Sequence, residues 1–231
     1  MANLRRWIVS LCTRRKAGAS SEEWKNIRLS FSQFGEDLLL QHLLPDKGFY
    51  IDLGANHPVT HSNTWLFYRN GWRGITVEPN PALAVLHRKR RPRDIMIEAA
   101  AGEKEGDGFL HVPASHLLGF VSLLRSEPET FRPGVRVPVL SLRGILERHL
   151  PSGTPIDLLN VDCEGMDLQI LKGNAWEKFR PTVICAESKT RKEREDLEAF
   201  LREKRYLFMA RAKHSVIYLE EGEFRKKFPE L

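Results

Sequence analysis

Several short segments of the chain are apolar along nearly their whole length and do not alternate between polar and apolar residues. They cover residues 49–56, 73–79, 156–162 and 182–187, and segments with helical spacing lie between them. A strand that is apolar on both faces must be covered on both sides, and helices that alternate with such strands provide that cover. The pattern predicts an α/β fold with one mostly parallel sheet in one domain.

The remaining elements are predicted from helix caps, breakers and periodicity. We expect helices over 38–44, 81–91, 141–149, 166–172 and 191–204, strands over 94–100, 109–112 and 135–140, and a C-terminal hairpin formed by 206–212 and 215–220. The hairpin would add an antiparallel strand to the sheet. A long segment, 111–132, is expected to form a loop over the acceptor site.

The composition is that of a globular protein, with 42% hydrophobic and 29% charged residues. No apolar run approaches the roughly 18 residues that a membrane-spanning helix needs. The three cysteines, Cys12, Cys163 and Cys185, form no CxxC pair. A disulfide framework and a structural zinc site are therefore disfavoured, and we expect a cytoplasmic protein.

The positive charge lies mostly at the N-terminus. The chain carries a net charge of +6, and residues 1–20 hold +5 of it, so the body is nearly neutral and a nucleic-acid partner is disfavoured. Residues 1–25 form a predicted basic amphipathic arm before a domain at 26–231. Its apolar stripe of Leu4, Trp7, Ile8, Leu11 and Cys12 fits peripheral contact with an anionic membrane through residues 1–20, or packing on its own domain or on another subunit of a homo-oligomer.

Two predicted strands end in residues suited to a nucleoside. Asp52 and Gly54 end the first, and Glu78 ends the second, where a carboxylate can accept hydrogen bonds from ribose hydroxyls. The GxGxxG and Walker A phosphate-binding loops are absent from the sequence. A ligand with a ribose, no phosphate and a positive charge fits these ends, which indicates S-adenosylmethionine.

Beyond these features, a series of motifs resembles the FkbM family of S-adenosylmethionine-dependent methyltransferases. The motifs run in order from about residue 30 to 190: SQFGED (32–37), YIDLGAN (50–56), SNT (62–64), GWRG (71–74), VEP (77–79), IDLLNVDCEG (156–165), LKG (171–173), RP (180–181) and the strand end at Glu187. The resemblance implies a class I methyltransferase fold with a seven-stranded sheet, and usually O-methylation of a sugar, glycolipid or polyketide-type hydroxyl. A small-molecule or glycan acceptor is therefore the expected partner.

The resemblance also implies cofactor contacts. Asp52, Gly54, Ala55 and Asn56 would line the methionine and ribose parts of the cofactor. Glu78, followed by Pro79, would hold the ribose, and Ala99, Ala100 or Ala101 would lie near the adenine.

Acidic residues at the next two strand ends suit the reacting side. Asp162, Glu164 and Glu187 are hard oxygen ligands that could bind a divalent metal such as Mg²⁺, or Asp162 or Glu187 could act as a general base. Alternatively, Asp162 only shapes the floor of the site, and Glu164 or Glu187 pairs with Lys172 or Lys189.

Two histidines, His57 and His61, follow the first strand and could accept a hydroxyl proton, or be exposed or capping residues. His61 is preferred because it precedes the SNT motif. The basic run at 87–93 fits phosphate binding or a solvated helix end.

Two other functions fit parts of this sequence. An RNA ribose 2′-O-methyltransferase would also methylate a hydroxyl, although the neutral body disfavours RNA binding. A non-catalytic cofactor-binding relic is the other alternative, which the acids at three strand ends disfavour.

Overall fold

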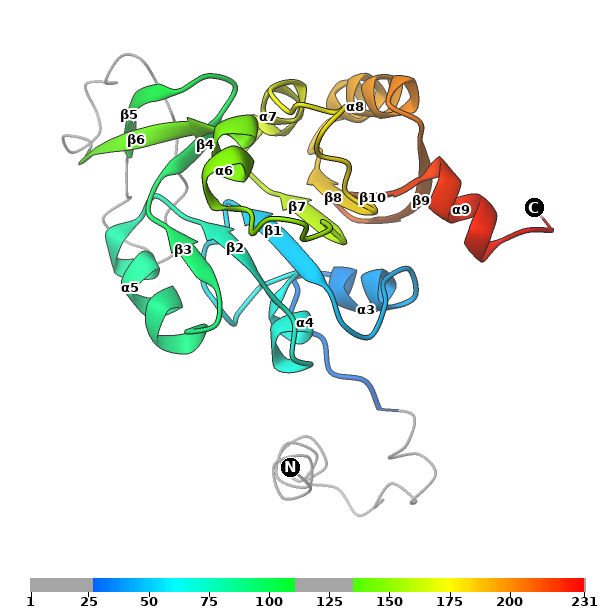
Figure 1. Ribbon diagram of the computed structural model, residues 1–231, viewed down its shortest axis with the longest axis horizontal. Coiled ribbons are helices and arrows are strands. Elements are labelled where there is room, and N and C mark those ends of the chain that lie inside the picture. Colours follow the sequence, from blue (N-terminus) through cyan, green and yellow to red (C-terminus); the bar gives the residue numbers. More distant parts are fainter. Residues whose placement is uncertain (1–26, 111–134, 231) are drawn as a thin grey trace.

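The computed structural model describes residues 27–110 and 135–230, and the other residues are drawn as a thin grey trace (Figure 1). The predicted N-terminal arm at 1–25 and the predicted loop at 111–132 lie outside the described residues. Within 27–110 and 135–230, no helix is long and apolar enough to cross a bilayer.

A seven-stranded sheet forms the centre of the molecule (Figure 1). Its strands are β1 (Phe49–Leu53), β2 (Arg73–Val77), β3 (Ile95–Ile97), β7 (Leu158–Val161), β8 (Val183–Glu187), β9 (Tyr206–Ala212) and β10 (Ser215–Glu220), in the order β3-β2-β1-β7-β8-β10-β9. β3, β2, β1, β7 and β8 pair in parallel, whereas β10 runs antiparallel to both β8 and β9. This is the class I methyltransferase fold with its C-terminal hairpin, as predicted.

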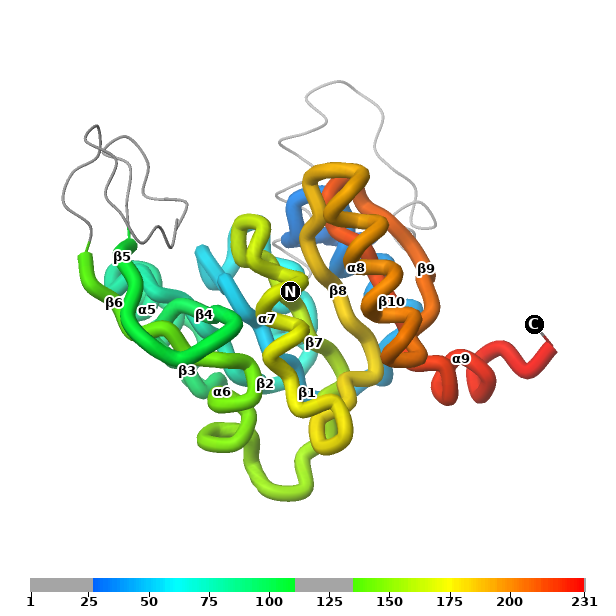
Figure 2. Tube along the Cα trace, turned by 90° about the horizontal axis from the view of Figure 1, so that it is seen from above, coloured from blue at the N-terminus to red at the C-terminus, as the bar shows by residue number. Residues whose placement is uncertain are grey.

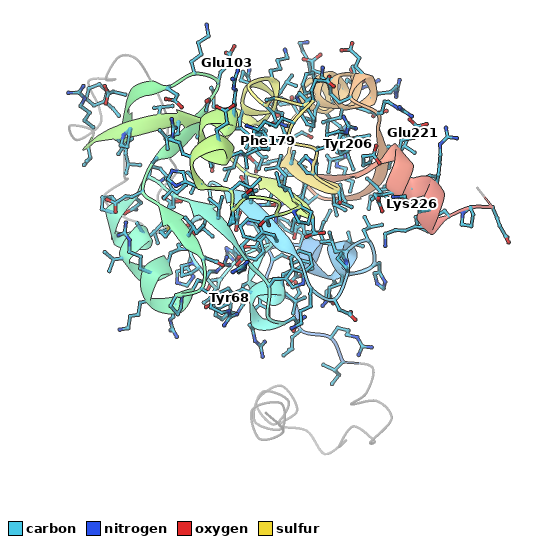
Figure 3. The ribbon with its side chains drawn as sticks, viewed as in Figure 1. Tyr68, Glu103, Phe179, Tyr206, Glu221 and Lys226 are labelled. Atoms are coloured by element: carbon cyan, nitrogen blue, oxygen red, sulfur yellow. The ribbon has the colours of Figure 1, made fainter. Side chains whose placement is uncertain are left out.

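Helices cover the two faces of this sheet. They are α3 (Glu36–Gln41), α4 (Trp65–Arg69), α5 (Pro81–Arg90), α6 (Leu142–His149), α7 (Asp167–Lys172), α8 (Arg191–Glu203) and α9 (Glu221–Lys227). Residues of α6, α7 and α8 share one apolar core with the sheet, and residues of α3 and α4 share the other. Figure 3 accordingly shows Phe179 and Tyr206 on the side of α7 and α8, and Tyr68 beside α4.

The helices begin where the sequence supplies caps. The side chain of Asn80 accepts a hydrogen bond from Ala82 N before α5, which has a proline at its first position. Ser141 caps α6 in the same way, as predicted. Thr190 and Glu193 form a capping box at the start of α8. These local bonds fix where the chain turns away from the ends of the strands.

The prediction of one sheet is wrong. A second, three-stranded sheet contains β4 (Ala100–Gly102), β6 (Val135–Ser141) and β5 (Gly106–Leu110). The predicted strand at 94–100 therefore splits, because β3 joins the main sheet and β4 pairs with β6. Small residues allow this close pairing, since a Cβ on Gly102 would lie 2.6 Å from the Val139 side chain.

Two short helices, α4 and α9, were not predicted. α4 follows the SNT motif directly, and Figure 2 shows α9 extending away from the main sheet at the C-terminal end. Both are short, five and seven residues, which leaves little helical periodicity to read from the sequence.

Candidate cofactor and acceptor site

The predicted strand-end residues lie along one edge of the main sheet. Leu53 at the end of β1 is in register with Val77 of β2 and Val161 of β7, and Val161 is in register with Ala186 of β8. The residues that follow these positions, Gly54, Glu78, Asp162 and Glu187, therefore sit side by side at the carboxyl ends of four adjacent parallel strands. Open α/β sheets bind ligands at this edge.

Gly54 makes the turn that opens the site. Its φ is +72°, a conformation that side chains disfavour, and an added Cβ would lie 2.0 Å from the carbonyl oxygen of Asp162. The amides of Gly54 and Ala55 both donate to the carbonyl oxygen of Val77, 3.0 Å away. The Gly54 backbone thus lies close to the Asp162 backbone, and this contact holds the ends of β1 and β7 together.

Glu78 has the geometry of a ribose-binding carboxylate. Its Oε2 accepts a hydrogen bond from Asn56 N (2.9 Å) and its Oε1 from Asn80 N (2.8 Å), and the residue is only 4% exposed. Each oxygen retains one lone-pair position for a further donor. Burial raises the pKa of Glu78, the main opposing influence being the two amide hydrogen bonds. Pro79 and Ala55 beside it are buried.

Asp52 is held by side chains of two other segments of the protein. Its Oδ2 accepts a hydrogen bond from Thr64 Oγ1, and its Oδ1 accepts one from Asn160 Nδ2 at 2.8 Å. Both oxygens of this buried carboxylate are therefore occupied by protein donors. Asp52 braces the loop after β1, and Asn160 in turn accepts a hydrogen bond from Asn63 Nδ2, the central residue of the SNT motif.

Arg91 is the cation that balances this region, and sequence analysis missed it. The guanidinium is buried and donates to Pro58 O, Thr64 Oγ1 and Ser62 Oγ. It also lies 3.9 Å from Asp52 Oδ2 and 3.7 Å from Asp94 Oδ2. The rings of Tyr50, Trp65 and Tyr68 surround it, with centroids 5.5–5.9 Å away.

For Arg91 and His87, both interpretations of the basic run at 87–93 are wrong, because both side chains are buried inside the fold. The signal that would have found them is their spacing. Leu83, His87 and Arg91 recur every four residues, so the two basic side chains continue the buried stripe of α5.

Asp162 lies in an acidic cluster at the ends of β7 and β8. Crowding by protein atoms and the charges of Glu187, Asp167 and Glu164 raise its pKa to about 8. Lys189 counters part of this effect, because its Nζ pairs with Glu164 and with Glu187 Oε2 (3.2 Å). The predicted alternative in which Glu164 or Glu187 pairs with Lys189 is confirmed.

Asp167 ties this cluster to the backbone. Its two carboxylate oxygens accept hydrogen bonds from Glu187 N (2.9 Å) and Cys163 N (3.3 Å), and burial raises its pKa to about 7. Over 27–110 and 135–230, no three His, Cys, Asp or Glu side chains are arranged to hold a metal ion. The positive charge that faces Glu164 and Glu187 is the Lys189 ammonium.

The histidines after β1 have unequal surroundings. His57 Nδ1 accepts hydrogen bonds from the amides of Val59 and Thr60, so this ring shapes its own turn. His61 is exposed, with φ +57°. Glu187 lies near enough to Asp162 for its charge to raise the Asp162 pKa, whereas no hydrogen bond or ion pair joins His61 to either acid among the described residues. Ala100 is buried at the start of β4.

The residues present fit S-adenosylmethionine. Glu78 offers a buried carboxylate whose oxygens each keep a lone pair for a ribose hydroxyl, and it accepts the Asn56 amide hydrogen bond directly after the Gly54 turn. When bound, this cofactor supplies an electrophilic methyl group.

The fold resembles solved methyltransferases at low sequence identity. A TehB-like S-adenosylmethionine-dependent methyltransferase from Corynebacterium glutamicum is 10% identical, with coverage of 95% of this chain and 96% of that chain and a TM-score of 0.42. An O-methyltransferase from Bacillus cereus is 14% identical (94% and 90%, TM-score 0.42). A precorrin-6y C5,15-methyltransferase from Geobacter metallireducens is 12% identical (80% and 87%, TM-score 0.44).

A comparison with curated protein sequences finds no match. The methyltransferase FkbM domain matches residues 52–208, from the Asp52 turn through β8 and into β9, which is more than half of the chain. The strand ends described above all lie within this match. This protein therefore belongs to the FkbM family and is an S-adenosylmethionine-dependent methyltransferase.

Proposed function

We propose that this methyltransferase transfers the methyl group to oxygen, and that its acceptor is a hydroxyl of a sugar, a glycolipid or a polyketide-type product. The observation that carries this proposal is the Asp162 carboxylate. It follows β7 directly, its backbone touches the Gly54 turn, and its raised pKa makes it a stronger proton acceptor than an ordinary aspartate.

The cofactor side of the site is formed by the β1 and β2 ends. Glu78 accepts hydrogen bonds from the ribose hydroxyls, and Gly54, Ala55, Asn56 and Pro79 line the turn around it. Ala100 lies on the adenine side. Asp52 supports this turn from the side away from the cofactor, because its oxygens already accept hydrogen bonds from Thr64 and Asn160.

The acceptor side is formed by the β7 and β8 ends. Asp162 receives the hydroxyl proton, and Glu187 forms an ion pair with Lys189. With Glu187 and Glu164 partly neutralised, Asp162 is the acid of this cluster that is available as a base. Methyl transfer mainly requires in-line positioning of the acceptor oxygen, so one such base is sufficient.

Binding of S-adenosylhomocysteine tests the cofactor side. Wild-type protein should bind it with micromolar affinity by calorimetry. Glu78→Gln should weaken binding by about 1–3 kcal/mol, because the ribose hydroxyls lose a charged acceptor. Unchanged affinity in Glu78→Gln would overturn the assignment of Glu78.

A panel of glycosides and polyketide alcohols, with mass spectrometry of the products, tests the acceptor. A mass gain of one methyl group on a hydroxyl supports the proposal, and methylation only at nitrogen or carbon contradicts it. We expect EDTA to leave turnover unchanged, because Lys189 already supplies the positive charge beside Glu164 and Glu187. Loss of turnover in EDTA that Mg²⁺ restores would favour the metal role for Asp162, Glu164 and Glu187 instead.

A further inference from the structure

One buried histidine contacts the backbone of the proposed cofactor site from outside it. His87 lies on α5, is 1% exposed, and places its Nε2 2.7 Å from the carbonyl oxygen of Asn56. Leu83 and Ala84 on the same helix are also buried, and Asn80 caps the helix start. The ring is therefore held in place by a helix that begins three residues after Glu78.

The chemistry of this contact determines where the proton lies. A carbonyl oxygen only accepts hydrogen bonds, so Nε2 must carry the hydrogen. Burial and the nearby positive charge of Arg91 lower the pKa of His87 to about 4, so the ring is neutral at physiological pH. Its other nitrogen, Nδ1, is buried and has no hydrogen-bond partner among the described residues. The hydrogen bond to Asn56 is thus the ring's single polar contact there.

Asn56 passes this contact on to Glu78. Its amide donates to Glu78 Oε2 at 2.9 Å while its carbonyl oxygen accepts from His87. The residue has φ +47°, a left-handed conformation that is costly for residues with a side chain. Because the His87 hydrogen bond holds the Asn56 carbonyl and the Glu78 hydrogen bond holds its amide, the two contacts together fix the φ and ψ of Asn56.

We propose that His87 is a positioning residue for cofactor binding: by holding the Asn56 carbonyl, it directs the Asn56 amide at Glu78 and so orients that carboxylate toward the ribose hydroxyls. This inference rests on the proposed role of Glu78. This function is distinct from core packing. A residue that only fills space would affect the binding of ligands with and without the ribose hydroxyl equally.

The test compares S-adenosylhomocysteine with its 2′-deoxyribose analogue by calorimetry. The ratio of their dissociation constants measures how well the ribose hydroxyl is recognised. In the wild type we expect a ratio of about tenfold or more, the value of a hydrogen bond to a charged group. His87→Leu, which cannot donate, should bring the ratio close to one by weakening S-adenosylhomocysteine alone. His87→Gln, which keeps a donor, should restore most of the ratio.

Leu83→Ala serves as the matched control, since it weakens packing on the same face of α5 without touching Asn56. It should leave the ratio at the wild-type value. If His87→Leu weakens both ligands equally and keeps the ratio, His87 is a packing residue and the inference is wrong. If Glu78→Gln also keeps the ratio, Glu78 does not bind the ribose, and the proposed function fails at that step independently of His87.

A second measurement uses the wild-type protein, in case His87→Leu does not fold. Long-range nitrogen–proton NMR of the histidine rings reports which nitrogen of His87 is protonated. We expect the Nε2–H form, with a shift that changes when S-adenosylhomocysteine binds and changes less with the 2′-deoxyribose analogue. An Nδ1–H form, or equal changes with both ligands, would overturn the proposal.

Discussion

Asp52 and Asp162 are both acids at the carboxyl ends of adjacent parallel strands, yet their surroundings differ. Asp52 is buried, and both of its oxygens accept hydrogen bonds from protein donors, with Arg91 nearby. Asp162 faces three other carboxylates, and among the described residues no side chain or amide donates to its carboxylate oxygens. The cation of its cluster, Lys189, is paired with Glu164 and Glu187.

This difference separates structural from chemical roles at one edge of a sheet. A carboxylate that accepts hydrogen bonds from side chains of two other segments, as Asp52 does, stabilises the loop that it holds. A carboxylate crowded by like charges has its charged form disfavoured, so it takes up a proton more readily. The Asp52 region is therefore expected to govern stability, and the Asp162 region turnover.

The largest expected effect on stability follows from removing the cation of the Asp52 region. Arg91→Met leaves Asp52 and Asp94 buried without their counter-charge, and should destabilise the fold by about 3–5 kcal/mol in urea denaturation. Arg88→Met is the matched control, because Arg88 pairs with Glu98 at the surface and such pairs contribute about 0–1 kcal/mol. Equal losses in both variants would show that Arg91 does not hold this region.

The two regions meet at Gly54, where the next effect is expected. Gly54→Ala adds a Cβ in contact with the Asp162 carbonyl to a left-handed backbone, and should cost about 2–5 kcal/mol. Gly35→Ala has a similar φ of +87° but open space around the new atom, so only the backbone cost of about 1–2 kcal/mol applies. Thermal unfolding of both variants separates the two contributions, and a Gly54→Ala protein as stable as Gly35→Ala would contradict the contact.

Turnover distinguishes the two acids themselves. Asp162→Asn should fold and bind S-adenosylhomocysteine, but lose about a hundredfold or more in turnover, since it cannot accept a proton. Wild-type turnover should rise with pH as Asp162 loses its proton near pH 8, and the variant should lack that rise. Near-wild-type turnover in Asp162→Asn would remove Asp162 from the chemistry.

The free energy of unfolding should depend on pH in the opposite sense to turnover. The folded-state pKa of Asp162 is raised, so the folded state binds the proton more tightly than the unfolded chain, and stability falls as pH rises from about 4 to about 8. Asp162→Asn should remove this loss, which urea denaturation at several pH values would reveal.

The smallest expected effect concerns His87, which contacts the Asn56 turn after β1. Its folded-state pKa of about 4 is below the ordinary 6.5, so as pH falls through this range the unfolded chain takes up a proton that the buried ring does not. The free energy of unfolding should fall by up to about 3 kcal/mol over this pH range. His87→Gln should not show this part of the acid-induced loss, and identical pH profiles for the two proteins would contradict the burial of a neutral ring.

Much of the fold and part of the site were predictable from local patterns. The apolar runs gave β1, β2, β7 and β8, the cap at Ser141 gave the start of α6, and the residues at the strand ends gave the location of Glu78 and Asp162. These features depend on short-range sterics, on backbone hydrogen bonding and on which segments are apolar enough to be buried. All of them can be read along the chain.

The tertiary structure alone decided which charges are neutralised and by what. Arg91 and His87 come from a basic run with the composition of a solvated helix end, and Asp52 meets Arg91 only because the β1 loop folds over α5. Lys189 reaches Glu164 across the ends of two strands, and β4 leaves the main sheet for a second one. The sequence by itself thus determined the strands, the family and the edge where chemistry occurs. The pairing of ionised groups depended on distances between segments far apart in the chain, because the free energy of a buried charge is set by its neighbours in space.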